Sequence, residues 1–140
     1  MERIGGALMI LTILHFVGDW MLQTEYIQLN KARNPRLRLL HVALYLIPFC
    51  AALPFWNSPR STGIWLAALL VWIAATHYWI DSYLPLYWWR KYIAKDPECE
   101  SVERFASAFS TPRGMTIYVT MDQGFHLLSL LPAAIALSWR

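Results

Sequence analysis

The sequence predicts an all-α fold, a four-span transmembrane helical bundle, and three observations support that class. The chain is 57% hydrophobic and 15% charged and contains eight tryptophans, which is more apolar than an ordinary soluble domain requires. Four apolar segments are each long enough to cross a bilayer, which takes about 20 helical residues. None of the four contains Lys or Arg. We expect residues 1–140 to form a single integral-membrane domain.

The predicted spans cover about residues 4–23, 39–56, 62–84 and 115–139. The first could be mistaken for a signal peptide because Arg3 precedes an apolar run. However, His15 and Asp19 interrupt that run and no small-residue cleavage pattern follows, so we expect a retained span. Pro48 and Pro132 fall inside spans, where neighbouring helices can absorb the lost backbone bonds.

Basic residues are unevenly distributed among the connections between the spans. The connection 24–38 carries four Lys or Arg residues and the connection 85–114 carries five, whereas the short second connection has only Arg60. By the positive-inside rule, connections 24–38 and 85–114 are cytoplasmic and both termini lie outside. The net charge of +3 then reflects loops that face anionic membrane lipid, and we expect no nucleic-acid partner.

Ionisable residues interrupt all four apolar segments. All four histidines and three of the four aspartates lie there, mostly in pairs four residues apart, a spacing that places both members on one helix face. Such residues are costly in hydrocarbon and indicate a functional site. The pairs are His15/Asp19, His77/Asp81 and Asp122/His126, and His41 stands alone.

These seven residues are predicted to meet at one depth. At 1.5 Å per residue, His15 and Asp19 lie about 12 and 6 Å from the cytoplasmic end of the first span. His41 lies within about 6 Å of the cytoplasmic start of the second span, and Asp122 lies roughly 10 Å inside the fourth. Because the spans alternate in direction, residues distant in sequence share one leaflet. A single cluster explains this pattern.

The charge of that cluster favours a bound cation. Three carboxylates with no Lys or Arg in any span would leave a charge of about −3 in a low-dielectric region, which is prohibitive without neutralisation. Imidazolium could neutralise them, but neutral His nitrogen and Asp oxygen also form the ligand set of zinc, manganese or iron. We expect one or two divalent ions, zinc before manganese or iron. The metal-ligand candidates are His15, Asp19, His41, His77, Asp81, Asp122 and His126.

Supporting roles are expected for two amides. Gln23 continues the face of His15 and Asp19, and Gln123 adjoins Asp122, so either could orient a ligand or a substrate. Asp19 and Asp122 are the leading candidates for a catalytic general base. Other familiar chemistries lack their motifs, because no CxxC, GxGxxG, P-loop or GxSxG pattern occurs.

The run HFVGDWMLQ, the following LLH, the later HYWID and the DQGFH of the last span resemble an uncharacterised family of small bacterial integral-membrane proteins, classed as a domain of unknown function. The similarity spans nearly the whole chain, and H-x3-D-x3-Q and DQ-x2-H are its more specific elements. A looser similarity, confined to polar motifs in membrane helices, links the chain to membrane-bound metal-dependent hydrolases. The first resemblance implies a bacterial inner membrane location. The residues that match its pattern are His15, Asp19, Gln23, His41, His77, Asp81, Asp122, Gln123 and His126.

We therefore expect a membrane-embedded metal-dependent hydrolase that uses metal-activated water on a lipid-linked or amphipathic substrate. Two alternatives stay open. The same residues could form an ion or proton path in a transport or channel subunit, with homo-oligomerisation around a pore, or a structural metal site in a small membrane binding or assembly protein. An enzyme should keep an open metal position beside a lipid-accessible cleft, and a transporter should show continuity from both faces.

Overall fold

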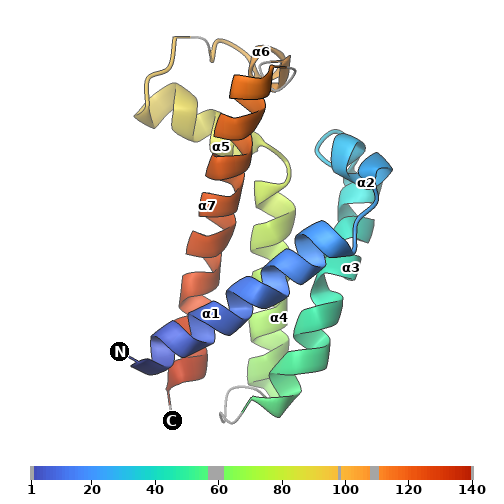
Figure 1. Cartoon of the computed structure of the whole chain (residues 1–140), viewed down its shortest axis with the longest axis vertical. Helices are drawn as coiled ribbons and strands as arrows, with labels where there is room; N and C mark the ends of the chain where they lie inside the picture. Colours follow the sequence, from blue (N-terminus) through green and yellow to red (C-terminus); the bar gives the residue numbers. More distant parts are fainter. Residues whose placement is uncertain (1, 57–61, 98, 108–110, 140) are drawn as a thin grey trace.

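The computed structural model describes residues 2–56, 62–97, 99–107 and 111–139, and all the regular elements in these ranges are helical (Figure 1). The bundle is built from α1 (Glu2–Phe16), α3 (Pro35–Ala52), α4 (Gly63–Ile80) and α7 (Pro112–Ser138). A π-helical turn, η1 (Val17–Met21), extends α1, and a 3-10 turn, η2 (Leu53–Phe55), extends α3. The shorter helices are α2 (Glu25–Asn30), α5 (Leu84–Trp88) with the π-helical η4 (Trp89–Ile93), and α6 (Val102–Ser107).

Three predicted spans are confirmed as helices long and apolar enough to cross a membrane. They are Glu2–Met21, Pro35–Phe55 and Gly63–Ile80. The fourth predicted span is helical in α7 but is not among these three. Its first half carries Thr116, Thr120, Asp122 and Gln123, which lower its hydropathy. The second connection, with Arg60, lies outside the described residues.

Polar caps followed by proline begin two of the long helices. The Asn34 side chain accepts hydrogen bonds from the N–H groups of Arg36 and Leu37, and Pro35 follows it. Thr111 accepts from the N–H of Gly114, and Pro112 follows. Proline suits the first helical position because its missing N–H would have no partner there. The helix α3 therefore begins four residues before the predicted span at residue 39.

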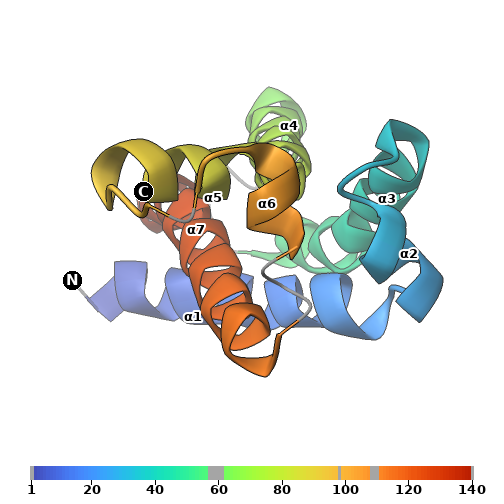
Figure 2. The ribbon, with the colours of Figure 1, turned by 90° about the horizontal axis from the view of Figure 1, so that it is seen from above.

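Both ends of the chain lie at one end of the bundle, and the short helices α2, α5 and α6 lie toward the other (Figure 1). We call these the terminal end and the loop end. Seen from above, α1 runs along one side of the bundle and α4 lies on the opposite side, with α3 and α7 between them (Figure 2). The four long helices therefore surround a common interior.

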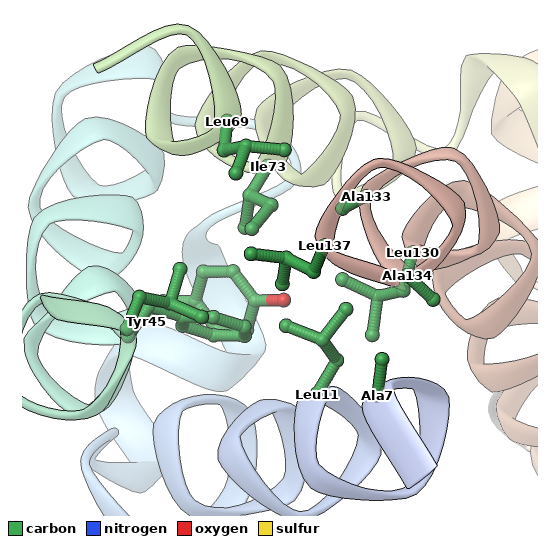
Figure 3. Close-up of a cluster of buried hydrophobic side chains, with 11 residues drawn as sticks. Ala7, Leu11, Tyr45, Leu69, Ile73, Leu130, Ala133, Ala134 and Leu137 are labelled. Carbon is green, nitrogen blue, oxygen red and sulfur yellow. The ribbon is translucent and has the colours of Figure 1, made fainter. Parts of the chain in front are cut away.

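An apolar core fills the interior toward the terminal end (Figure 3). All four long helices contribute to it, and Ala7 and Ala134 are fully buried, as small residues are where helices approach closely. This packing closes the terminal half of the bundle. The core consists of Ala7, Leu11, Tyr45, Phe49, Leu53, Leu69, Ile73, Leu130, Ala133, Ala134 and Leu137.

A close contact between η1 and α3 depends on Gly18. A Cβ atom built on Gly18 would lie 2.6 Å from the backbone oxygen of Tyr45 and 2.8 Å from its Cδ2. Real side-chain carbons do not approach a backbone oxygen so closely. Glycine thus lets the turn that carries Asp19 sit directly against α3.

We predict that Gly18→Ala destabilises the protein by about 1–3 kcal/mol, because the added methyl group forces η1 away from the α3 backbone. Gly124→Ala is the matched control, since a Cβ there meets no atom within 4 Å and alanine favours a helix. The measurement is the melting temperature in detergent. Equal melting temperatures for the two variants would contradict the proposed contact.

Candidate metal centre

The seven predicted ionisable residues come together in one buried cluster on the loop-end side of the apolar core. None is more than 7% exposed. The residue His15 lies in the last turn of α1, Asp19 in η1 and His41 in α3. The remaining four come from the end of α4 and from α7. Together they form the polar cluster: His15, Asp19, His41, His77, Asp81, Asp122 and His126.

A first group of four donor atoms comes from Asp19, His41, His77 and Asp81. The Nε2 atom of His41 lies 2.9 Å from His77 Nε2 and 3.0 Å from Asp19 Oδ1. It also lies 3.3 Å from Asp81 Oδ2. His77 Nε2 lies 3.3 Å from Asp81 Oδ2 and 3.7 Å from Asp19 Oδ1.

This spacing fits a shared cation. Ligands about 2.0–2.1 Å from a tetrahedral ion lie about 3.3 Å from one another, and the five distances above range from 2.9 to 3.7 Å. Hydrogen bonds among these four groups do not by themselves explain the convergence, because one imidazole nitrogen carries at most one hydrogen. His41 Nε2 cannot bond to a histidine and two carboxylates at once. The four groups could therefore hold a metal ion.

A second group consists of Asp81, Asp122 and His126. His126 Nδ1 donates to the backbone oxygen of Asp122 at 2.9 Å, which leaves Nε2 as the nitrogen with the lone pair. That Nε2 is buried without a hydrogen-bond partner and lies 3.9 Å from Asp81 Oδ1. Asp81 belongs to both groups, Oδ2 near the first and Oδ1 near the second. A carboxylate in this position can bridge two ions.

His15 and Gln123 support the two groups. The Nε2–H of His15 donates to Gln123 Oε1 at 3.0 Å, and its Nδ1 then accepts from the Tyr45 hydroxyl at 3.2 Å. The amide Nε2 of Gln123 donates to Asp19 Oδ2 at 3.1 Å and to Asp122 Oδ2 at 3.2 Å. The structure thus places His15 in neither group of donor atoms, and its role as a metal ligand stays a prediction.

Tertiary contacts define the places of three further residues, His41, Tyr45 and Gln23. His41 has no acidic partner four residues away, yet it contacts members of three other elements. Tyr45, one helical turn after His41, was not identified from the sequence. Its ring stacks on His77 with the centroids 3.6 Å apart and the planes 9° apart, which fixes the orientation of that imidazole. Gln23 lies at the edge of the cluster, and its Oε1 is buried without a hydrogen-bond partner.

The main residue missed by sequence reasoning is Lys31, which follows α2 and reaches into the polar cluster. Its Nζ donates to Asp19 Oδ1 at 3.2 Å and to His41 Nε2 at 2.9 Å, and lies 3.1 Å from Asp81 Oδ1. Burial alone would lower the pKa of Lys31, but the carboxylates of Asp81 and Asp19 outweigh it and raise that pKa. The side chain is therefore an ammonium ion. The sequence does offer one hint of an inward face, because the apolar residue Ile27 lies four positions earlier and is buried.

The fold and the cluster define a helical protein with three helices long and apolar enough to span a membrane, and with buried His and Asp groups that could hold a metal ion. A family model described as protein of unknown function (DUF3307) matches residues 7–139. The chain belongs to this family, which confirms the resemblance to an uncharacterised family. Searches of curated proteins and of solved structures find no match.

We predict that Asp81→Asn lowers the amount of bound zinc per chain more than His41→Ala or His126→Ala does, because Asp81 belongs to both donor groups. The measurement is elemental analysis of protein purified in detergent without chelators. Glu25→Gln, a change at an exposed carboxylate, is the control and should leave the metal content unchanged. Wild-type protein without stoichiometric metal would overturn the assignment.

Proposed function

We propose that the protein is a membrane-embedded metal-dependent hydrolase that acts on a lipid-linked or amphipathic substrate. The observation that carries this proposal is a cavity of about 430 Å³ directly beside the polar cluster. Asp19 and Asp122 line this cavity and also belong to the donor groups, whereas Asp81 is not among its lining residues. The cluster is thus accessible to a small molecule from one side, as a catalytic metal site requires and a closed structural site does not.

The lining of the cavity suits an amphipathic molecule. One part is polar, with carboxylates, amides and cations, and another is apolar. Trp20 and Leu29 in the apolar part are more than half exposed, at 56% and 64%, so this part is open at the surface of the chain. A volume of this size accommodates a head group with the first part of a chain. The apolar part consists of Trp20, Leu29, Ala32, Ala106, Met115, Tyr118 and Val119.

The residues of the cluster would have different roles in a hydrolase. The donor groups would hold the ions, and a divalent ion bound there would lower the pKa of its water to about 7 and polarise an ester oxygen. Asp122 is the preferred general base because it lines the cavity and is the most exposed of the three carboxylates, at 7%. In this role it would not bind an ion, and Asp81 and His126 would hold the second ion. Tyr118 donates to its Oδ1 at 3.4 Å and Gln123 to its Oδ2, which orients the carboxylate. Asp19 is engaged by Lys31, His41 and Gln123.

The apolar core argues against a path for ions through the bundle. A transport subunit would need continuity from both faces. On the terminal side of the cluster, however, Leu11, Phe49, Ile73 and Leu130 are each at most 1% exposed. Within the described residues of a single chain, the polar cluster is therefore accessible from the cavity side alone. This favours chemistry at a pocket over conduction.

We also propose that α7 is the fourth membrane span. Its residues Asp122 and His126 are buried and so would not meet lipid. Thr116 and Thr120 donate their hydroxyl groups to the backbone oxygens of Pro112 and Thr116, which satisfies those hydroxyls within the helix. With four crossings, the basic connections at the loop end face the cytoplasm of a bacterial inner membrane. The cavity then opens toward the cytoplasmic leaflet.

We predict that Asp122→Asn lowers the turnover of a susceptible ester by about 10²- to 10⁴-fold at saturating zinc or manganese, because it removes the proton acceptor at the cavity. The assay is hydrolysis of a panel of lipid esters and phosphoesters. The melting temperature should stay close to that of the wild type. For Asp81→Asn it should fall, because that change removes the carboxylate partner of the buried Lys31 and histidine side chains. Failure of metal-loaded wild-type protein to hydrolyse any member of the panel would overturn the hydrolase.

We predict that the loop end and the terminal end react with a membrane-impermeant thiol reagent from opposite sides. In a background with Cys50 and Cys99 replaced by alanine, Arg36→Cys should be labelled only after intact cells are opened, because its connection is cytoplasmic. Phe55→Cys, at a site 87% exposed near the terminal end, should be labelled in intact cells. Labelling of Arg36→Cys in intact cells would show that the predicted orientation in the membrane is wrong.

A further inference from the structure

The cavity beside the polar cluster carries cations as well as carboxylates. The buried ammonium of Lys31 lines it, and so does Arg33, two residues further along the same connection. The amides of Gln23 and Gln28 also line it, and amide N–H groups can donate to an anion. This lining suggests that the cavity binds a negatively charged group.

The charge of the cluster depends strongly on how many ions it holds. With Lys31, the three aspartates leave a net charge of about −2 in a region that is almost fully buried. One divalent ion would neutralise that charge. Two ions, one for each donor group, would leave about +2 beside the cavity. Buried excess charge needs a partner, and a dianionic head group would supply it where a neutral ester would not.

Metal binding would also change what Lys31 can contact. His41 Nε2 and Asp19 Oδ1 are hydrogen-bond partners of Lys31 and also members of the first donor group. The single lone pair of an imidazole nitrogen cannot accept from the ammonium and bind an ion at the same time. An ion in that group therefore takes a partner away from Lys31. The ammonium then has N–H groups for the cavity that it already lines.

We propose that the cavity binds the phosphate head group of an amphipathic phosphate monoester, with Lys31 and Arg33 as its anion-binding residues. This inference rests on the proposed hydrolase and names its class of substrate. Ammonium and guanidinium groups are the usual protein partners of phosphate, and guanidinium can bind it through two hydrogen bonds. The apolar part of the lining, with Trp20 and Leu29, receives the start of the lipid chain.

The test compares two arginines of one connection. Arg33 and Arg36 are both exposed, but only Arg33 lines the cavity. With zinc-loaded protein in detergent, hydrolysis of a short-chain phosphatidate should be competitively inhibited by inorganic phosphate. Arg33→Gln should raise the KM for phosphatidate by about tenfold with little change in kcat, as expected for lost ground-state binding. Arg36→Gln should behave as the wild type.

A second pair of variants addresses Lys31 itself. Lys31→Met should abolish inhibition by inorganic phosphate, and Lys31→Arg should restore part of it, because the charge returns with a different shape. If Lys31→Met fails to fold, the arginine pair decides alone. Tight binding of phosphatidate without competition from inorganic phosphate would mean that the chain, and not the head group, is recognised. That outcome would overturn the anion site.

The remaining outcomes separate the two proposals. Zinc-loaded protein that hydrolyses a neutral carboxylic ester, with no effect of phosphate or of Arg33→Gln, would keep the hydrolase and overturn the phosphate site. Phosphate binding that depends on Lys31 and Arg33, without turnover of any ester, would keep the anion site and overturn the hydrolase. Wild-type protein that binds no metal would overturn both.

Discussion

The burial of three carboxylates among four apolar helices is the constraint on which the rest of the structure depends. Asp19, Asp81 and Asp122 come from different parts of the chain, and each would be prohibitively costly in this position without positive partners. The chain supplies one ammonium, Lys31, and surrounds it with imidazoles. The side chains that meet here tie η1, α3, α4 and α7 to one point. The contacts of the site therefore also hold these elements of the fold together.

The bundle is divided along its length into two halves with different chemistry. Toward the terminal end, α1 and α7 approach closely through Ala7 and Ala134, and the interior is wholly apolar. Toward the loop end, the interior is polar and adjoins a cavity. Tyr45 joins the halves, because its ring belongs to the apolar core and stacks on His77 while its hydroxyl binds His15. A rigid apolar half suits a protein that must hold each of several ligands to within about 0.5 Å of its required position.

Much of this arrangement could be predicted from the sequence, since polar residues in apolar segments are conspicuous and their spacing of four places them on helix faces. The part that could not be predicted depends on tertiary contacts. Lys31 lies in a basic connection, where a lysine is expected for topological reasons, and only the packing of α2 on α3 turns it inward. The central position of His41 depends on the distances between helices, and residue spacing along a single helix gives no information about those distances. The early start of α3 follows from Asn34 and Pro35, which an analysis of hydropathy overlooks.

The direction of the helices adds to the charge of the cluster. Asp81 is the C-terminal cap of α4, and Asp19 lies in the turn that ends α1, so both helices direct the negative ends of their dipoles at this point. The positive ends of α3 and α7 lie at Pro35 and Pro112, more than one turn from His41 and Asp122, and the dipole effect fades within one turn. Each negative end is equivalent to about half an elementary charge. The backbone itself therefore attracts cations to the cluster, which would help bound ions stay in place when an anionic product leaves.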